Sequence, residues 1–494
     1  MLNILTPAQG LLFLALYGAV MIAVTLSVSR GRDQTMPEFL LASRSVGVVA
    51  GAMSIAASWI WAPALFVSSQ KAFEQGLPGA FWFIFPNFLA LALFGPIGLR
   101  IRQVLPSGFT FPQYIRLRHG ESVHRLYLFQ FFILQLCSFA VQILGGAKLI
   151  SLMSGLPFAG VGVALVVIVL SYSIRGGFRA SVATDYIHLC TILAICAVMI
   201  PWCVVRAGGV QSLATGLAGA SGKFGNLFDG NVAYSFGLSA TVGLLSGPVG
   251  DQMHWQRAYS LKSDKDVIKT FMLASVLFVT VPLSLSVLGF IAAGKVAGGS
   301  WIIPTTQMVG PTTVAMLLPG AMVIVFATML LSGLCSTLDS ILCAVSSLVV
   351  CNVYGEAAGV STAHSGASRP PMDETRRLRI ARTSMIVAAL AGLSIAMIPK
   401  LEIVHLFLFY GTLRASTMVP TILTLFWSGL SSRAAFYAVL LSMLFGAPVL
   451  ALGTYQKNPD LAVSGTTLVL VIGLSCCLLL SKKSVPQTTP RSLV

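Results

Sequence analysis

The chain has 494 residues, of which 56% are apolar and only 9% are charged, against roughly 25% in ordinary soluble domains. This composition excludes an ordinary soluble protein and favours one that crosses a membrane repeatedly. The formal net charge of +16 does not indicate nucleic-acid binding, because the basic residues alternate with apolar runs of about 20 residues and form no sustained basic face.

About thirteen apolar runs are long enough to cross a membrane as helices, so the predicted fold class is an all-α integral membrane protein. The first run has no basic residue before it and no A-x-A cleavage pattern, which favours a retained span over a signal peptide. The runs centre near Gly18, Ser58, Ala90, Gln135, Leu165, Ala194, Thr241, Phe278, Ala327, Ala388, Phe409, Leu440 and Leu470.

The basic residues divide unequally between alternate loops. One set of loops, which includes the C-terminal tail, holds 23 of the 31 Lys and Arg residues, and the other set holds 6. Cytoplasmic loops carry the excess of positive charge, so we expect the N-terminus outside and the C-terminus in the cytoplasm of a cell (inner) membrane protein. An odd number of spans requires the same arrangement.

No segment between the spans is long enough to form a soluble domain, and no G-x-x-x-x-G-K-[ST] phosphate loop occurs. We therefore expect neither an enzyme nor an ATP-driven pump, and no organic cofactor. The expected partners are a small solute and the lipid bilayer, without nucleic acid and without an obligatory protein partner.

The second and seventh runs are both interrupted. In the second run, AGAMSIAASWIWAPALFVSSQ, Pro63 has no amide hydrogen with which to bond the Trp59 carbonyl. In the seventh run, Ser246 and Gly247 precede a second proline. Two broken spans five apart indicate an inverted 5+5 repeat with a binding site near the membrane midplane, whereas a plain proline kink is the simpler alternative.

The ninth run extends from about Thr313 to Asn352, and its stretch Leu330–Tyr354 combines apolar residues with several hydroxyls and a carboxylate. Ser336 and Thr337 are adjacent, and Gly333 lies one turn before Ser336. Their oxygens suit a small hard cation. Serines that only allow close helix packing, or that bond back to their own backbone, are the alternative.

Four short motifs resemble the sodium:solute symporters, the family of proline, sugar, pantothenate and urea symporters. The stretch YSIRGGFRA, followed by Thr184 and Asp185, looks like the family signature, with a tight cytoplasmic turn between two spans. Resemblances also occur in Ala57-x-x-Ile60, in Trp255-Gln256-Arg257 and in CSTLDS of the ninth run.

The resemblance implies a LeuT-type core made of two inverted repeats, residues 46–230 and 231–430. Residues 1–45 are then a peripheral helix and loop, residues 431–483 are two C-terminal helices, and residues 484–494 are a cytoplasmic tail. It also implies a sodium site, with ligands drawn from two segments: the backbone carbonyls of Ala57, Ile60 and Gly333, and the hydroxyls of Ser336 and Thr337.

Asp185, Asp339 and Ser340 form a possible second site for an ion or a proton, since some family members hold a second sodium between these helices. Asp339 has three alternatives: an ion ligand, a proton carrier, or a carboxylate that pairs with an arginine at the cytoplasmic side. Sodium is therefore the expected coupling ion, with H⁺ as the alternative.

The solute is expected to be small and polar, and a urea-like amide is favoured because residues 57–82 and 249–257 resemble the urea-transporter branch. Trp59 and Trp61 would form flat walls, with Ser58 or Gln142 as hydrogen-bond partners. The alternative is that one or both tryptophans only pack against lipid or protein. The remaining solute-site candidates are Ser246, Gly247 and Tyr410.

Arg414 departs from the urea branch, which is apolar at this position. A cation within a span is a candidate functional residue, and its guanidinium can clamp a carboxylate. The alternatives are a pair with an aspartate or a side chain that reaches the membrane interface. The predicted function is sodium-coupled symport by alternating access. The alternatives are symport of a small carboxylate held by Arg414, a passive channel, and a transporter-like sensor.

Overall fold

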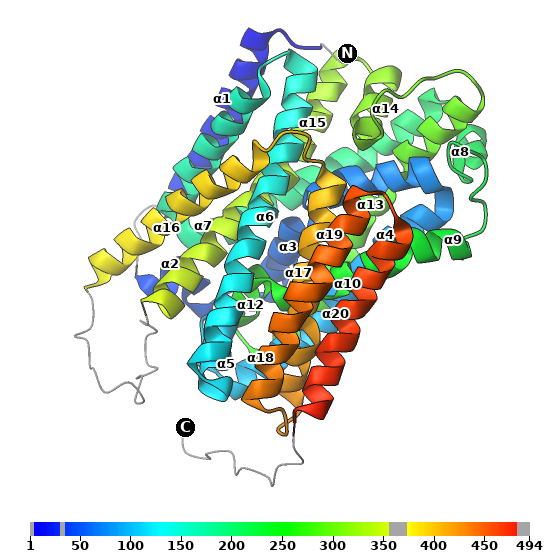
Figure 1. Ribbon diagram of the computed structural model, residues 1–494. Helices are drawn as coiled ribbons and strands as arrows, with labels where there is room; N and C mark the ends of the chain where they lie inside the picture. Colours follow the sequence, from blue (N-terminus) through cyan, green and yellow to red (C-terminus); the bar gives the residue numbers. More distant parts are fainter. Residues whose placement is uncertain (1–3, 30–34, 355–372, 482–494) are drawn as a thin grey trace.

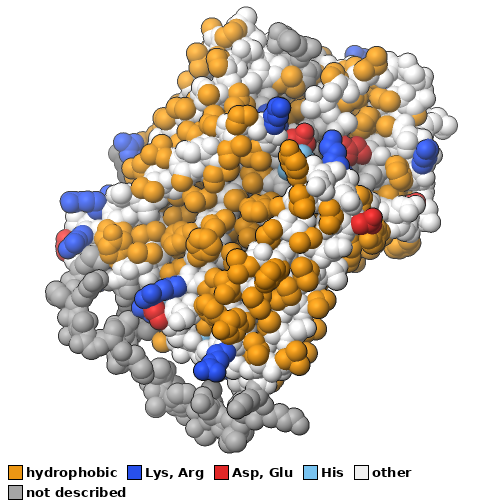
Figure 2. Space-filling model, in the orientation of Figure 1, with side chains coloured by type: hydrophobic (Ala, Val, Ile, Leu, Met, Phe, Trp, Pro, Cys, Tyr) orange, Lys and Arg blue, Asp and Glu red, His pale blue; other side chains and the backbone are white. Residues whose placement is uncertain are grey.

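The computed structural model describes residues 4–29, 35–354 and 373–481. The described residues form a bundle of helices and contain no β-strand (Figure 1). Ten helices in the described part of the chain are long and apolar enough to cross a membrane. Hydrophobic side chains cover the central part of the face shown in Figure 2, as expected of a surface that contacts lipid.

The ten long helices are α1 (Pro7–Ser29), α4 (Ser68–Val104), α6 (Glu121–Ser154), α7 (Phe158–Arg206), α13 (Asp264–Ala297), α15 (Gly320–Leu348) with η5 (Val349–Val353), α16 (Glu374–Ala396), α17 (Ile403–Phe426), α18 (Ser432–Leu441) with η6 (Ser442–Gly446) and α19 (Ala447–Tyr455), and α20 (Pro459–Leu479). The shorter elements are α2 (Met36–Leu41), η1 (Ala42–Arg44), α3 (Val48–Trp59), η2 (Pro63–Val67), α5 (Phe111–His119), α8 (Val210–Gly216), α9 (Gly230–Val232), η3 (Ala233–Gly237), α10 (Leu238–Leu245), α11 (Gly247–Gly250), α12 (Gln252–Ser260), η4 (Thr306–Met308) and α14 (Val309–Leu317).

Side-chain caps fix the starts of several helices. At α5, Thr110 and Gln113 form a capping box, so that two amide hydrogens of the first turn find partners. The Ser263 hydroxyl accepts from the amide of Lys265 at the start of α13, and the Asn458 side chain accepts from the amide of Asp460 at the start of α20. These polar residues mark the points at which one apolar helix is separated from the next.

Helix α7 contains two spans that meet at Gly177, where φ is +56°. Before this residue the chain runs antiparallel to α16, since Gly162 packs on Leu393 and the Ile174 carbonyl accepts from Arg382. After it the chain returns along α15, from a hydrogen bond of Ser181 to Asp339 toward the Leu317 carbonyl, which accepts from Arg206. The tight turn predicted in YSIRGGFRA is therefore present.

A similar kink divides α4 at Gly76, with φ +59°. A Cβ atom at this position would lie 2.4 Å from the Leu217 carbonyl oxygen, so only glycine fits. The start of α1 and the end of α20 lie at opposite ends of the bundle (Figure 1), as an odd number of spans requires. The count of thirteen spans, the orientation in the membrane and the division into repeats stay predictions. Residues 484–494 lie outside the described part of the chain.

Two helices are broken near the middle of the bundle. Helix α3 ends at Trp59, and Ile60 leaves the helical conformation with φ −82° and ψ 69° before η2 begins at Pro63. The seventh predicted span is divided among α9, η3, α10, α11 and α12, with Asp251 in an extended conformation between α11 and α12. Both interruptions predicted from the sequence are present, and they leave backbone groups outside the regular helical bonding pattern.

Candidate solute and cation site

The break between α3 and η2 is held by Gln142 from α6. Its Oε1 accepts from the amide of Ala62 at 2.7 Å, and its Nε2 donates to the Ser138 carbonyl at 3.2 Å. Because both ends of the amide are engaged within the protein, Gln142 positions the break in this conformation. Ser58 is similarly occupied, since its hydroxyl donates to the Ile55 carbonyl of its own helix at 3.0 Å.

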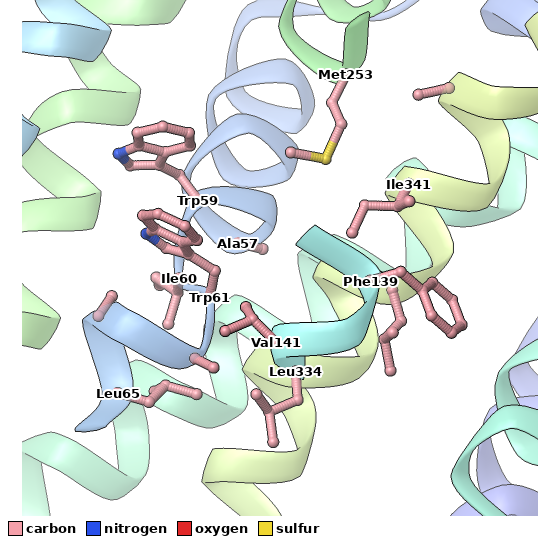
Figure 3. Packing of buried hydrophobic residues seen from close by; sticks show 14 of the residues in the cluster. Ala57, Trp59, Ile60, Trp61, Leu65, Phe139, Val141, Met253, Leu334 and Ile341 are labelled. Carbon is pink, nitrogen blue, oxygen red and sulfur yellow. The ribbon is translucent and has the colours of Figure 1, made fainter. Parts of the chain in front are cut away.

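Helix α15 approaches the break closely enough for oxygens of both segments to meet. A Cβ atom on Gly333 would lie 2.7 Å from the Ile60 carbonyl oxygen, so the glycine permits this contact. The Thr337 hydroxyl lies 3.1 Å from the carbonyl oxygens of both Ser58 and Gly333. Figure 3 shows Ala57, Ile60 and Trp61 around the break, with Leu334 of α15 nearby.

Two of the five predicted sodium ligands are engaged differently. The Ala57 carbonyl accepts from the Ile60 amide at 3.1 Å, and the Ser336 hydroxyl donates to Asp185 Oδ1 at 2.5 Å. In this conformation the structure thus brings Ile60, Gly333 and Thr337 together and turns Ser336 toward α7. The five-oxygen set stays a prediction.

Asp185 forms a buried ion pair with Arg257. The Arg257 Nη2 lies 2.9 Å from Asp185 Oδ2, and the side chains are 2% and 0% exposed. Ser54 of α3 connects the two, because its hydroxyl donates to Asp185 at 2.5 Å and accepts from Arg257 Nε at 3.0 Å. Asp185, Arg257 and Ser54 therefore link α7, α12 and α3 at a single point.

Asp339 has only neutral partners among the described residues. Its carboxylate accepts from Ser181 at 2.8 Å, from Thr184 at 3.2 Å and from Ser340 at 3.2 Å. The Ser340 hydroxyl also accepts from Arg257 Nη2 at 2.7 Å. Of the three alternatives for Asp339, direct pairing with an arginine is therefore not seen, because Arg257 binds Asp185 instead.

Arg414 lies at the centre of an aromatic cage. Its guanidinium carbon is 5.4 Å from the ring centroid of Trp59, 5.1 Å from that of Trp61 and 4.8 Å from that of Tyr410. The two indole rings stack at 5.3 Å, as Figure 3 also shows. Such contacts stabilise a cation that is shielded from water.

Arg414 also pairs with Asp251. Its Nη2 lies 2.9 Å from Asp251 Oδ2, and both side chains are at most 1% exposed. The other carboxylate oxygen accepts from Gln135 Nε2 at 2.8 Å and from the Met253 amide at 3.1 Å, and thereby caps α12. The predicted alternative of a pair with an aspartate is therefore present, and Arg414 does not reach the interface.

Several polar atoms around this pair have no hydrogen-bond partner among the described residues. A buried polar group without a partner is costly, so a group of them in one place indicates a binding site for a polar molecule. The atoms are Trp59 Nε1, Trp61 Nε1, Gln135 Oε1, Tyr410 Oη, Arg414 Nε and Arg414 Nη1.

Glycines of α11 make room for this group. A Cβ atom on Gly247 would lie 2.4 Å from the Trp59 ring, and one on Gly250 would lie 3.1 Å from the Arg414 side chain. Ser246 instead bonds back to the Gly243 carbonyl at 3.1 Å. Of the predicted solute-site residues, Trp59, Trp61, Gly247, Tyr410 and Arg414 therefore lie together.

Asp251 and Gln135 contribute to this group but were not predicted from the sequence. Asp251 carried a usable signal, because a carboxylate within an interrupted span requires a partner and Arg414 is the uncommon cation of another span. Gln135 carried no comparable signal, since a lone glutamine within a helix does not show which way it faces.

Comparisons with known proteins show which family this chain resembles. Residues 39–442 match the family model for the sodium:solute symporter family. A probable urea active transporter 1 of Schizosaccharomyces pombe is 33% identical over 181 residues, which are 36% of this chain and only 27% of that relative's length.

Two further relatives align over most of the chain. The urea-proton symporter DUR3 of Oryza sativa subsp. japonica is 23% identical over 94% of this chain and 69% of the relative. The sodium/pantothenate symporter of Haemophilus influenzae is 24% identical over 90% of this chain and 88% of the relative.

A solved structure of a Na⁺-coupled sialic acid symporter, in a substrate-bound outward-open state, superposes with a TM-score of 0.76 over 97% of this chain and 99% of that one. At 16% identity this likeness shows the fold alone, and it confirms the predicted LeuT-type class. Because the family model covers well over half of the residues, the chain belongs to the sodium:solute symporter family.

Proposed function

We propose that the protein couples sodium entry to the uptake of a small, neutral, amide-like solute by alternating access. The observation that carries this proposal is the group of unpartnered polar atoms around the neutral Arg414–Asp251 pair, next to the broken helix α3–η2. Urea is the favoured solute, in keeping with the urea transporters among the relatives.

The sodium part of the proposal rests on the oxygens at the break. Backbone carbonyls of Ile60 and Gly333 and the Thr337 hydroxyl are neutral ligands, which suit a monovalent ion that is released in every cycle, whereas Ca²⁺ usually requires carboxylates and more ligands. An ion there would join α3 to α15. Its binding and the binding of the solute would strengthen each other reciprocally.

The solute part rests on charge and hydrogen-bonding capacity. Arg414 and Asp251 compensate each other, so a neutral solute adds no net charge to a site that excludes water. Indole and guanidinium N–H groups can donate to a carbonyl oxygen, and Gln135 Oε1 can accept from an amide. The flat indole rings match a planar solute.

A small carboxylate is the second candidate, because Arg414 Nε and Nη1 are without partners and a sodium/pantothenate symporter is among the relatives. A carboxylate would leave the site with a net negative charge while Asp251 remains ionised. The neutral solute is favoured for this reason.

The proposal is tested by uptake into proteoliposomes with a panel of urea, small amides, small carboxylates and proline. We expect urea or a related amide to accumulate against its gradient when sodium is higher outside, and not when the sodium gradient is collapsed. Uptake that follows an imposed proton gradient and ignores sodium would assign the coupling to H⁺. Equilibration without accumulation would indicate a channel, and no uptake or counterflow of any panel solute would favour a sensor.

Substitution of Thr337 tests the sodium site. We expect Thr337→Ala to weaken the apparent affinity for sodium at least about tenfold, because one of five ligands is lost and each factor of ten corresponds to about 1.4 kcal/mol. Thr337→Ser keeps the hydroxyl and should retain most of the affinity. Ser336→Ala should also weaken it. Wild-type sodium dependence in both alanine variants, measured on equal amounts of inserted protein, would show that Ser336 and Thr337 are not sodium ligands.

Three variants of the ion pair separate the two solute classes. Arg414→Gln leaves Asp251 buried and uncompensated, which costs about 3–5 kcal/mol, so uptake and stability should both fall. The double variant Arg414→Gln with Asp251→Asn restores neutrality and should recover measurable amide uptake. Asp251→Asn alone leaves an unpaired guanidinium and should admit small carboxylates.

The contrary outcome is that the wild-type protein takes up a carboxylate that both variants without Arg414, while remaining stable, no longer take up. In that case the solute is a carboxylate and not an amide. Thermal stability in detergent, measured for each variant, distinguishes a loss of solute binding from a loss of folding.

A further inference from the structure

A groove lies between α6, α15 with η5, and α16, and none of its lining residues belongs to the broken helices. It has a volume of about 860 Å³, and its walls are largely apolar, including Phe132, Leu136, Val345, Val349, Val387 and Ala391. Helices α6 and α16 diverge toward the end at which α16 begins (Figure 1). The groove is therefore an indentation between helices that are long enough to cross a membrane, so lipid can reach it.

The groove changes character along its length. Near the start of α16 its lining includes Arg376 and Arg379, followed by Thr383, and farther along the same helix only apolar residues such as Val387 and Ala391. The separations of three or four residues place these side chains on one face of the helix. From Arg376 to Ala391 the rise is about 22 Å, which is comparable to the thickness of one membrane leaflet.

The charged end of the groove has two cations without a partner among the described residues. Arg376 and Arg379 are exposed, and neither forms a hydrogen bond or an ion pair with another residue in the described part of the chain. Asp373 also lines this end and is the opposing charge, while Thr375, Thr383 and Ser384 add hydroxyls. Two guanidinium groups against one carboxylate leave this end of the groove net positive.

We propose that this groove binds an anionic phospholipid. Guanidinium groups bind phosphate through paired hydrogen bonds, and the apolar walls accept an acyl chain at the depth where the chain lies in the surrounding leaflet. Basic pockets between helices on the cytoplasmic side are suited to such headgroups. A soluble anion would use only the charged end, and a polar peptide would bury backbone groups against apolar walls without partners.

The site is independent of the proposed solute and of the coupling ion. One of its walls, however, belongs to α15, which carries Gly333 and Thr337 eight or more residues before Val345. A lipid in the groove would contact the helix that is proposed to bind sodium. Lipid binding can therefore be measured without transport, and its effect on transport can be measured separately.

The test is native mass spectrometry of the full-length protein, with phosphatidylglycerol or phosphatidylcholine of identical acyl chains. We expect the wild type to retain phosphatidylglycerol about tenfold more than phosphatidylcholine. The preference should disappear in Arg376→Gln with Arg379→Gln. It should persist in the matched control Arg433→Gln with Lys262→Gln, which removes the same charge from exposed positions outside the groove.

A second variant tests the apolar part and protects against a folding defect in the first. Ala391→Trp fills the groove without changing its charge, and retention of phosphatidylglycerol should fall at least about fivefold while the melting temperature stays near that of the wild type. Inorganic phosphate at the same concentration should not displace the lipid.

Three results would overturn the proposal. Unchanged retention in both the charge variant and Ala391→Trp would place the bound lipid elsewhere. An equal loss in the Arg433/Lys262 control would indicate attraction by net charge alone. Displacement by inorganic phosphate would indicate a soluble anion as the occupant.

Discussion

Single residues in this protein act through the partner that the fold assigns to them. Arg414 is the clearest example, because a lone cation in a span is compatible with a clamp, an ion pair or an interfacial anchor. The structure places it 2.9 Å from Asp251 and inside a cage of Trp59, Trp61 and Tyr410. A charge that is fully compensated in this way favours recognition of neutral solutes.

Gly247 offers a test of the cage at the level of one methyl group. A Cβ atom would lie 2.4 Å from the Trp59 ring, so Gly247→Ala should displace the indole and lower the apparent affinity for the solute about tenfold, in line with overpacking costs of about 1–3 kcal/mol. Gly230→Ala is the matched control, because nothing lies within 4 Å of its Cβ position. Concentration-dependent uptake checks the prediction, and equal affinities in the two variants would exclude Trp59 from the solute site.

Helix breaks and turns decide where the functional residues meet. Pro63 ends the regular bonding of α3, and the amide of Ala62 then binds Gln142 of α6. Asp251 both interrupts the α11–α12 segment and caps α12. The interruptions thus free backbone groups, which are bound by a side chain of another helix at Ala62 and by Asp251 of the interruption itself at α12.

The turn at Gly177 joins two spans, and its conformation is one that residues with side chains rarely adopt. Gly177→Ala should destabilise the protein by roughly 1–3 kcal/mol, since φ is +56° and a Cβ atom would lie 2.8 Å from the Phe39 carbonyl oxygen. Gly160→Ala, in the same helix with open space around it, should have little effect. Thermal unfolding in detergent compares them, and equal melting temperatures would show that the turn adjusts without strain.

At the scale of the molecule, two buried networks tie the broken helices to their surroundings. Arg257 of α12 reaches Asp185 of α7, and Asp251 reaches both Arg414 of α17 and Gln135 of α6. The cage itself is buried, so a solute that binds there, as proposed, would enter only when helices move apart. Alternating access would then require these polar contacts to be exchanged for others, which gives a conformational change with discrete states.

The orientation of the whole bundle follows from charge and is directly testable. Because 23 of the 31 Lys and Arg residues fall in one set of loops, the N-terminus should face outward and the C-terminus the cytoplasm. Reporter enzymes that are active only outside or only inside the cell, fused to either end, should give opposite signals. Signals from the same side at both ends would contradict the odd number of spans, and reversed signals would place the proposed lipid groove in the other leaflet.

Much of the architecture was accessible from the sequence, because it depends on local physical requirements. Apolar runs, interrupted spans and the glycine turn each depend on neighbouring residues. The described part of the chain contains ten long apolar helices, both interruptions and the turn. The family motifs were equally local, so that membership could be predicted and then confirmed by the match over residues 39–442.

The pairing of side chains between distant spans was decided only by the tertiary structure. Whether Arg257 binds Asp185 or Asp339 depends on how α7, α12 and α15 are rotated about their axes, and hydropathy does not specify this rotation in helices that are apolar on most sides. The same holds for Arg414 and Asp251, which are 163 residues apart in the chain and in contact in the fold. The sequence alone determined a helical membrane protein with two interrupted spans, whereas helix packing determined which charges compensate each other and which buried polar atoms have no partner among the described residues.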